Sequence, residues 1–279
     1  MKKTNIKNVL MLLVLFSNVV LTSCYKKFDS TSYQPAFTIN GYTSSTDIGK
    51  GSLVGYWAFE GTNIDSVSNT VATGVNTSFA AGFKGKAMQG SANGYVITDL
   101  PAAIKGLKSF TIDYWINSPI NSTGILTPIC ISNDNDFWGS LDMFYENGST
   151  ASSGNLKVHF KGQSEVWFTN GMILNPWGTW QNIALTYDAA SSTFTLYQGG
   201  NAVANASAAG LGDLVFSSGA TKLIFGTEQF QCTPSRGTAG GAQGWASYLT
   251  GQLDEMRIYN KALTKTDIQA LIVLQGKGK

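Results

Sequence analysis

Short runs of alternating apolar and polar residues, separated by clusters of Gly, Asn, Ser and Pro, fill the chain from 51 to 274. The run NLKVHFK at 155–161 is an example. Leu156, Val158 and Phe160 share one face of an extended strand, and Lys157, His159 and Lys161 share the other. Helical spacing is almost absent over this whole stretch, so the pattern predicts an all-β fold whose sheets have one covered face.

Nine such runs are predicted strands, and no segment of different composition separates them. They span 53–60, 109–116, 125–132, 140–146, 155–161, 179–188, 193–199, 221–227 and 251–259. We therefore expect one large two-sheet sandwich rather than two small domains. Only the end departs from the pattern, where Thr264 followed by Asp267 is typical of a capping box. A short helix is predicted from Lys265 to about Leu274.

The first residues of the chain are typical of an export signal. Three lysines among the first seven residues precede an apolar run from Val9 to Leu21, which is too short and wrongly flanked for a membrane span. The run ends in Leu-Thr-Ser-Cys, which resembles a bacterial lipobox and implies cleavage before Cys24 and a lipid on its sulfur. The alternative is a plain signal peptide with an incidental cysteine.

This reading divides the chain into a signal peptide at 1–23, a lipidated tether at 24–50 and a folded domain at 51–279. A lipid at Cys24 implies contact with a membrane and a place in the cell envelope, on the outer membrane, with the periplasmic or surface face left open. The 19 basic residues fall to 16 once the three signal lysines are removed, against 17 acidic ones. This near-neutral balance excludes a basic stripe for nucleic acid.

Two further cysteines, Cys130 and Cys232, remain in the predicted mature chain. In an exported protein they either form a disulfide or lie as two buried thiols, and the sequence leaves both alternatives open.

The order of several motifs is that of a known superfamily. They are LVGYWAFEGTNIDSVSN, GFKGKAMQG, SFTIDYWIN, WGTWQNIALTYDAASSTFTLYQGG and the closing LTGQLDEMRIYNKALTKTDIQAL. Together they resemble the laminin-G-like, concanavalin A-like lectin/glucanase superfamily. The resemblance implies a two-sheet antiparallel jelly roll with one curved sheet whose concave face commonly binds carbohydrate, to which the short C-terminal helix predicted above is added. The lipoprotein form resembles those of Bacteroidetes-like bacteria, so a glycan and other envelope polysaccharide-utilisation proteins are the implied partners.

The superfamily's glucanases carry their catalytic carboxylates on one strand as E-x-D-x-x-E. The comparable stretch here is QLDEMR, and alignment on Asp254 replaces the two essential glutamates by Gln252 and Arg257. Because glycoside hydrolysis needs a pair of carboxyl groups, this loss predicts a domain that binds without catalysis. His159 is the sole histidine, which excludes a histidine metal cluster.

Two rival functions remain open at this point. One is a glycoside hydrolase with carboxylates from unrelated loops, for which Asp134, Asp136 and Glu165 are the candidates. The other is a structural or adhesion module that binds protein through exposed strand edges or an aromatic rim.

A sugar site needs an aromatic platform beside convergent polar groups. Trp138 follows the polar run SNDNDF, so Asp134, Asp136 and Trp138 are predicted to contact carbohydrate. The alternative is a solvated turn anchored by one aromatic. Trp167 and Trp245 are further candidates, the latter at the end of a Gly-rich loop.

Two more residues, His159 and Tyr145, are expected to line the same surface if the strand order permits. For His159 the alternative is an exposed strand histidine between two lysines.

Calcium is the expected cofactor, with a structural role, because related folds bring first and last strands together. Asp65 and Asp254 are its predicted ligands; otherwise Asp65 caps a turn and Asp254 accepts from backbone amides. Strand alternation further places Asp254 on the face of Met256, and it pairs Glu255 with Arg257 on the other face.

Overall fold

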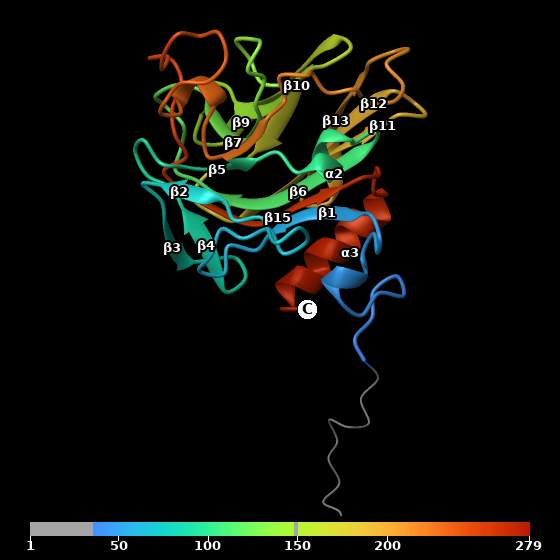
Figure 1. Cartoon of the computed structure of the whole chain (residues 1–279). Coiled ribbons are helices and arrows are strands. Elements are labelled where there is room, and N and C mark those ends of the chain that lie inside the picture. Colours follow the sequence, from blue (N-terminus) through green and yellow to red (C-terminus); the bar gives the residue numbers. More distant parts are fainter. Residues whose placement is uncertain (1–35, 148–149) are drawn as a thin grey trace, which may run out of the picture. The chain divides into compact units, whose positions relative to one another are not determined.

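The computed structural model describes residues 36–147 and 150–279, and within them Thr38–Lys279 form one compact unit (Figure 1). The predicted signal peptide at 1–23 and the predicted lipid site at Cys24 lie outside the described residues. Among the described helices, none has the length and apolar character needed to cross a membrane.

The described residues form two antiparallel sheets. The first runs in the order β13-β12-β11-β6-β15-β4-β3, with β1 also paired to β15, and the second runs β10-β9-β8-β7-β14-β5-β2. The first sheet comprises β1 (Leu53–Trp57), β3 (Ser78–Ala81), β4 (Lys86–Gln89), β6 (Phe110–Asn117), β11 (Gln181–Asp188), β12 (Thr193–Gln198), β13 (Asn201–Ser207) and β15 (Gln252–Tyr259). The second comprises β2 (Thr73–Val75), β5 (Tyr95–Asp99), β7 (Leu126–Ile131), β8 (Leu141–Tyr145), β9 (Ser153–Lys161), β10 (Glu165–Leu174) and β14 (Lys222–Phe225). The helices are α2 (Ala102–Lys105), α3 (Lys265–Gly276) and the short 3-10 turns η2 (Ser45–Asp47) and η3 (Gln229–Gln231).

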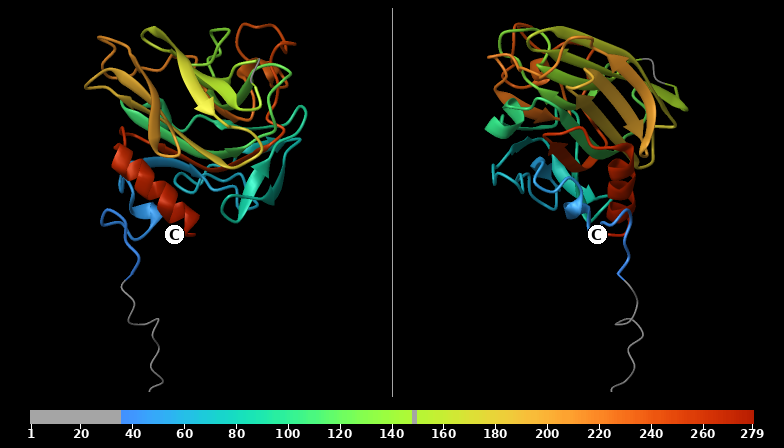
Figure 2. Two further views of the ribbon diagram at one scale, coloured as in Figure 1. Left: turned by 180° about the vertical axis from the view of Figure 1, so that it is seen from behind. Right: turned by 90° about the vertical axis from the view of Figure 1, so that its right-hand side faces the viewer.

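The two sheets pack face to face (Figure 2), and the apolar side chains between them form the main core. Leu156, Val158 and Phe160 all point into this core, as their alternation predicts. Each of the nine predicted runs contains a strand, and together they form a jelly-roll sandwich. The predicted all-β, two-sheet fold is confirmed.

The C-terminal helix α3 covers the outer side of the first sheet (Figure 1). Thr264 and Asp267 cap it reciprocally, as predicted, and the helix begins at Lys265. Leu271 is fully buried in a second apolar cluster between the helix and the sheet. The helix therefore covers the outer face of the first sheet and, among the described residues, does not contact the outer face of the second sheet.

A bulge in β15 corrects one prediction. Glu255 has a left-handed backbone with φ 51°, and the pairing with β6 shifts register between Asp254 and Arg257. One residue therefore drops out of the alternation. Met256 lies in the main core, whereas Asp254 pairs opposite Trp115 on the outer face. The expectation that Asp254 and Met256 share a face was wrong, because strict alternation does not anticipate a bulge.

The predicted pair of Glu255 and Arg257 is present, with 2.8 Å between Oε2 and Nη2, and both side chains are fully buried. The Arg257 guanidinium also donates to the carbonyl and hydroxyl oxygens of Ser45, at 3.2 and 3.3 Å. Nearby, the hydroxyl of Tyr42 donates to Asp267 of α3 at 2.8 Å. The segment up to residue 50, expected to be a tether, is thus part of the compact unit from Thr38 onward.

Candidate functional site

One residue from each of five neighbouring strands forms a straight row on the outer face of the second sheet. Ile224 of β14 lies opposite Cys130 of β7, which lies opposite Asp142 of β8. Asp142 in turn lies opposite His159 of β9, and His159 opposite Trp167 of β10. These residues alternate with core residues along their strands, so they point away from the sandwich interior. The row is buried at the end formed by Ile224 and Cys130 and exposed at the end formed by Trp167.

Two loops cover the buried end of this row: 132–140, after β7, and 226–250, after β14 (Figure 1). Gln229 holds them together. Its side-chain amide donates to the carbonyl oxygens of Asn133, Asp136 and Phe137 at 2.9 to 3.2 Å, and its oxygen accepts from the Asn133 amide at 2.6 Å. Because Gln229 is fully buried, these four bonds fix the position of the residues just before Trp138.

Three predicted tryptophans meet here: Trp138 and Trp245 belong to the two loops and Trp167 to β10. The ring centre of Trp138 is 5.4 Å from that of Trp167 and 5.7 Å from that of Trp245. Trp138 also stacks on Phe144 of β8, with ring centres 5.4 Å apart and planes 10° from parallel. Trp167 and Trp245 are 41% and 42% exposed, while Phe230 packs beneath both Trp138 and Trp245. The result is a supported aromatic surface with two open indole rings.

Charged side chains border this surface. Lys161 places its ammonium 2.7 Å from Asp136 and 3.5 Å from Glu165. Glu165 also accepts from the indole N–H of Trp167 at 3.3 Å and lies 3.1 Å from His159 Nε2. Partial burial raises the pKa of Asp136 and of Glu165, but Lys161 and His159 outweigh it, and both pKa values end below their usual range. Asp136 and Glu165 are therefore carboxylates at neutral pH.

His159 is fully buried, so the alternative of an exposed strand histidine was wrong. Its Nδ1 lies 2.9 Å from Asp142, and its Nε2 faces Glu165. Burial lowers the pKa of His159 and raises that of Asp142. Both directions favour a protonated Asp142 beside a neutral imidazole. Asp142 then donates to His159 Nδ1, and the proton on Nε2 is donated to Glu165. His159 thus braces Glu165 from below rather than facing solvent.

The other predicted contacts lie elsewhere. Asp134 is held by Arg236, whose Nη2 donates to both carboxylate oxygens at 2.7 and 2.8 Å, and by the hydroxyl of Thr221 at 2.6 Å. Tyr145 points into the main core and packs on Trp177. It alternates with Phe144, which does face the site, so the expectation that Tyr145 shares the surface of His159 was wrong.

The two predicted calcium ligands both receive backbone hydrogen bonds. Asp65 accepts from the amides of Tyr56, Val67 and Ser68 at 2.7 to 3.1 Å, which is the arrangement of a turn-capping residue. Asp254 accepts from the amides of Lys84 and Glu255 at 3.0 and 2.8 Å. Calcium at these residues stays a prediction.

Several residues of the site were not predicted from the sequence. Phe144 and Asp142 were missed. Alternation along the run LDMFY at 141–145 already places both on the face opposite to Leu141, Met143 and Tyr145. Lys161 was assigned to the outer face without a role, and Phe230 gave no signal because it lies in a loop far along the chain.

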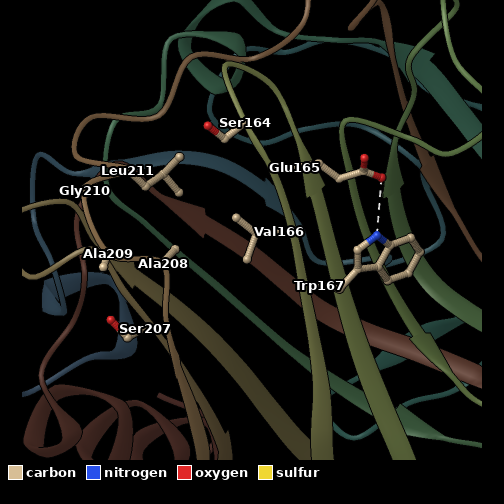
Figure 3. A pocket seen from close by; sticks show the side chains of 9 residues that line it. All are labelled: Ser164, Glu165, Val166, Trp167, Ser207, Ala208, Ala209, Gly210 and Leu211. Carbon is tan, nitrogen blue, oxygen red and sulfur yellow. Dashed lines mark hydrogen bonds between the residues drawn. The ribbon is translucent and has the colours of Figure 1, made fainter.

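An open pocket of about 410 Å³ lies at the sandwich edge beside Trp167, between residues 164–167 and 207–211. Figure 3 shows Val166 pointing toward Leu211, while Glu165 and Trp167 point away to the outer face. The pocket and the aromatic surface are thus separated by the β10 backbone.

The two remaining cysteines, Cys130 and Cys232, are buried in one small apolar cluster as free thiols. The disulfide alternative is therefore not what the structure shows.

Solved structures share this fold. The binding domain of Paraclostridial mosquitocidal protein 1 matches with TM-score 0.58 and 17% identity, over 79% of this chain and 52% of that one. The ligand binding domain of botulinum neurotoxin serotype D, in complex with N-acetylneuraminic acid, matches with TM-score 0.57 and 13% identity, over 84% and 53%. Domain 4 of AbnA, a GH43 extracellular arabinanase from Geobacillus stearothermophilus, in complex with arabinotriose, matches with TM-score 0.55 and 18% identity, over 79% and 98%.

At these identities the likeness concerns the fold, and this chain spans about half the length of the two toxin domains. No curated protein sequence matches the chain. The sequence model of one family does match, over residues 89–269, which include eleven of the fifteen described strands, from β5 to β15, and the first turn of α3. The chain belongs to the concanavalin A-like lectin/glucanases superfamily.

Proposed function

We propose that this domain binds carbohydrate without cleaving it, through the surface formed by Trp138, Trp167 and Trp245. The observation that carries the proposal is the meeting of these three side chains, more than a hundred residues apart at the extremes, on one supported surface. Open indole rings offer flat apolar faces that match the apolar face of a pyranose ring. Two of the three are more than two-fifths exposed, so a ligand reaches them without rearranging the core.

The charged border supplies the polar half of such a site. Asp136, Lys161 and Glu165 are all partly exposed and are held in place by their mutual contacts. Sugar hydroxyls both donate and accept, so a carboxylate and an ammonium side by side suit them. The complexes of related folds with arabinotriose and with N-acetylneuraminic acid are consistent with a sugar ligand.

The protonation of this border favours binding over hydrolysis. A glycosidase needs one carboxyl group that holds a proton at working pH, and such groups have raised pKa values. The pKa values of Asp136 and Glu165 are lowered instead, and Asp134 is tied to Arg236. These three were the candidates of the hydrolase alternative, and none has the environment of a catalytic acid.

The leader and Cys24 complete the proposal. A lipid on Cys24 would anchor the domain in the bacterial cell envelope, where it would hold polysaccharide near the membrane and near other glycan-handling proteins.

A glycan array tests the binding, with Trp167→Ala and Trp245→Ala as variants and Tyr145→Phe as the matched control. Each tryptophan variant should lose about tenfold or more in affinity, since a tenfold loss corresponds to about 1.4 kcal/mol and central aromatic contacts often exceed that value. Tyr145→Phe should bind as the parent does, because its hydroxyl points into the core and has no hydrogen-bond partner among the described residues.

Absence of any glycan above background would refute the proposal and favour a protein-binding module. Reducing sugar released from a bound polysaccharide would refute the non-catalytic part alone.

A further inference from the structure

A second cluster lies beneath the aromatic surface, at the buried end of the row. Cys130, Asp142 and Glu228 each offer one metal-ligating atom, and the three atoms lie within 4.8 Å of one another. All three residues are fully buried. Ligands around a single metal ion lie at similar separations, because metal–ligand bonds are about 2.0 to 2.3 Å long.

The fold holds these groups rigidly. Cys130 and Asp142 are directly opposite each other on β7 and β8. Glu228 comes from the loop after β14, immediately before η3, and accepts a hydrogen bond from the Thr127 hydroxyl at 2.8 Å. Asp142 is fixed from the other side by His159 at 2.9 Å, the kind of outer contact that orients metal ligands.

The cluster is incomplete without a ligand. Asp142 Oδ1 and Glu228 Oε2 have no well-formed hydrogen bond among the described residues, although both side chains are 0% exposed. The two carboxyl groups face each other and the Cys130 thiol, and Asp142 also faces the Gly139 amide. Buried carboxyl oxygens are normally paired, and leaving two unpaired side by side is costly. Burial raises the pKa of both carboxyl groups and of the Cys130 thiol, and the charge of Asp142 raises that of Glu228 further. A cation at this point would supply the missing partner to both oxygens.

We propose that Cys130, Asp142 and Glu228 bind one divalent transition metal ion of the zinc type. The sulfur ligand favours zinc and disfavours calcium and magnesium, which prefer oxygen alone. On binding, Cys130 and Glu228 release their protons to the buffer, the proton between Asp142 and His159 moves to Nδ1, and one sulfur–metal and two oxygen–metal bonds form. The inference rests on this cluster alone and stands whether or not the domain binds sugar.

The ion would have a structural role. Two residues after Glu228 comes Phe230, whose ring centre lies 5.7 Å from that of Trp138 and 5.3 Å from that of Trp245. A metal that joins Glu228 to β7 and β8 would therefore fix the loop that supports the aromatic surface.

Cobalt is the probe for this site, because a thiolate bound to Co²⁺ gives a charge-transfer absorption in the near ultraviolet. The full-length protein is unfolded in denaturant with a chelator, freed of both, and refolded with one equivalent of Co²⁺. We expect the absorption to appear, to saturate at about one ion per chain, and to vanish when Zn²⁺ displaces Co²⁺.

Cys130→Ser should abolish the band, and Cys232→Ser, the matched control, should keep it. Cys232 is also buried and next to the cluster, but it does not belong to the group of three. Asp142→Asn should weaken cobalt binding at least about tenfold, since loss of a ligand costs one metal bond.

The wild-type spectrum decides the question even if Cys130→Ser does not refold. If refolded wild-type protein shows no thiolate band with Co²⁺, or if Cys232→Ser loses the band while Cys130→Ser keeps it, the proposal is overturned. In that case the two carboxyl groups share a proton instead of an ion.

Discussion

Replacement of Glu255 by Gln should destabilise the domain more than any single exposed charge would. Glu255 lies 2.8 Å from Arg257, and both side chains are 1% exposed. It also accepts from the Tyr56 hydroxyl at 2.6 Å and from the Gln275 amide at 3.1 Å. The amide of Gln in place of the carboxylate keeps the shape but leaves the Arg257 guanidinium buried without a counter-charge.

Removal of one partner from a buried ion pair costs about 3–5 kcal/mol. For a domain of this size each kcal/mol shifts the melting temperature by about 2–4 °C, so we expect Glu255→Gln to melt about 10 °C lower. Urea unfolding followed by tryptophan fluorescence measures the free energy directly. The matched control is Asp213→Asn, whose pair with Lys108 has a similarly short distance, 2.7 Å, but whose two side chains are more than half exposed. An exposed pair is worth at most about 1 kcal/mol.

The loss should also depend on pH. Burial alone would raise the pKa of Glu255, but Arg257 and Tyr56 outweigh it, and the pKa is lowered from 4.5. A lowered folded-state pKa gives stability that is present above about pH 4.5 and is lost as the pH falls through the folded value. The gap between wild type and Glu255→Gln should therefore close in acid. Equal costs for Glu255→Gln and Asp213→Asn at pH 7 would refute this reasoning.

Three further outcomes follow from the structure. Burial raises the pKa of Asp113 to about 7, so its contribution to stability is present below pH 3.8 and is lost as the pH rises to 7. Asp113→Asn should therefore make the melting temperature depend less on pH and should raise it at pH 8. Leu271→Ala should cost about 2–5 kcal/mol in urea unfolding because the side chain is fully buried under α3, whereas Ile272→Ala, only partly buried, should cost less than half as much. Glu255→Gln combined with Arg257→Met should be more stable than Glu255→Gln alone, since no charge is then stranded.

The sequence predicts the architecture well because its information is local. Alternation along each strand and the capping box at Thr264 and Asp267 are read within a few residues, and both are present in the structure. The short strands β2 and β3, with little buried surface, gave no comparable signal.

The candidate site depends on register, which sequence alone does not give. Trp138 and Trp245 meet because Gln229, in the loop of Trp245, forms hydrogen bonds with the loop of Trp138. No pattern within a few residues predicts these bonds. The error for Tyr145 did not come from register. Alternation within 141–145 already places Tyr145 on the core face and Phe144 on the outer face. The wrong face for Asp254 came from a bulge, which changes the parity of every residue that follows.

The row across β7, β8, β9 and β10 joins strands that follow one another directly in the chain and pair as successive hairpins. Contacts of this low sequence separation close small loops and form quickly. The first sheet is different, because β15 at its centre pairs with β6, β4 and β1, and so the last strand of the chain completes it. During synthesis the strands β7 to β10 are therefore available for pairing before β15 has emerged, and the first sheet that covers their core side is complete only with residue 259.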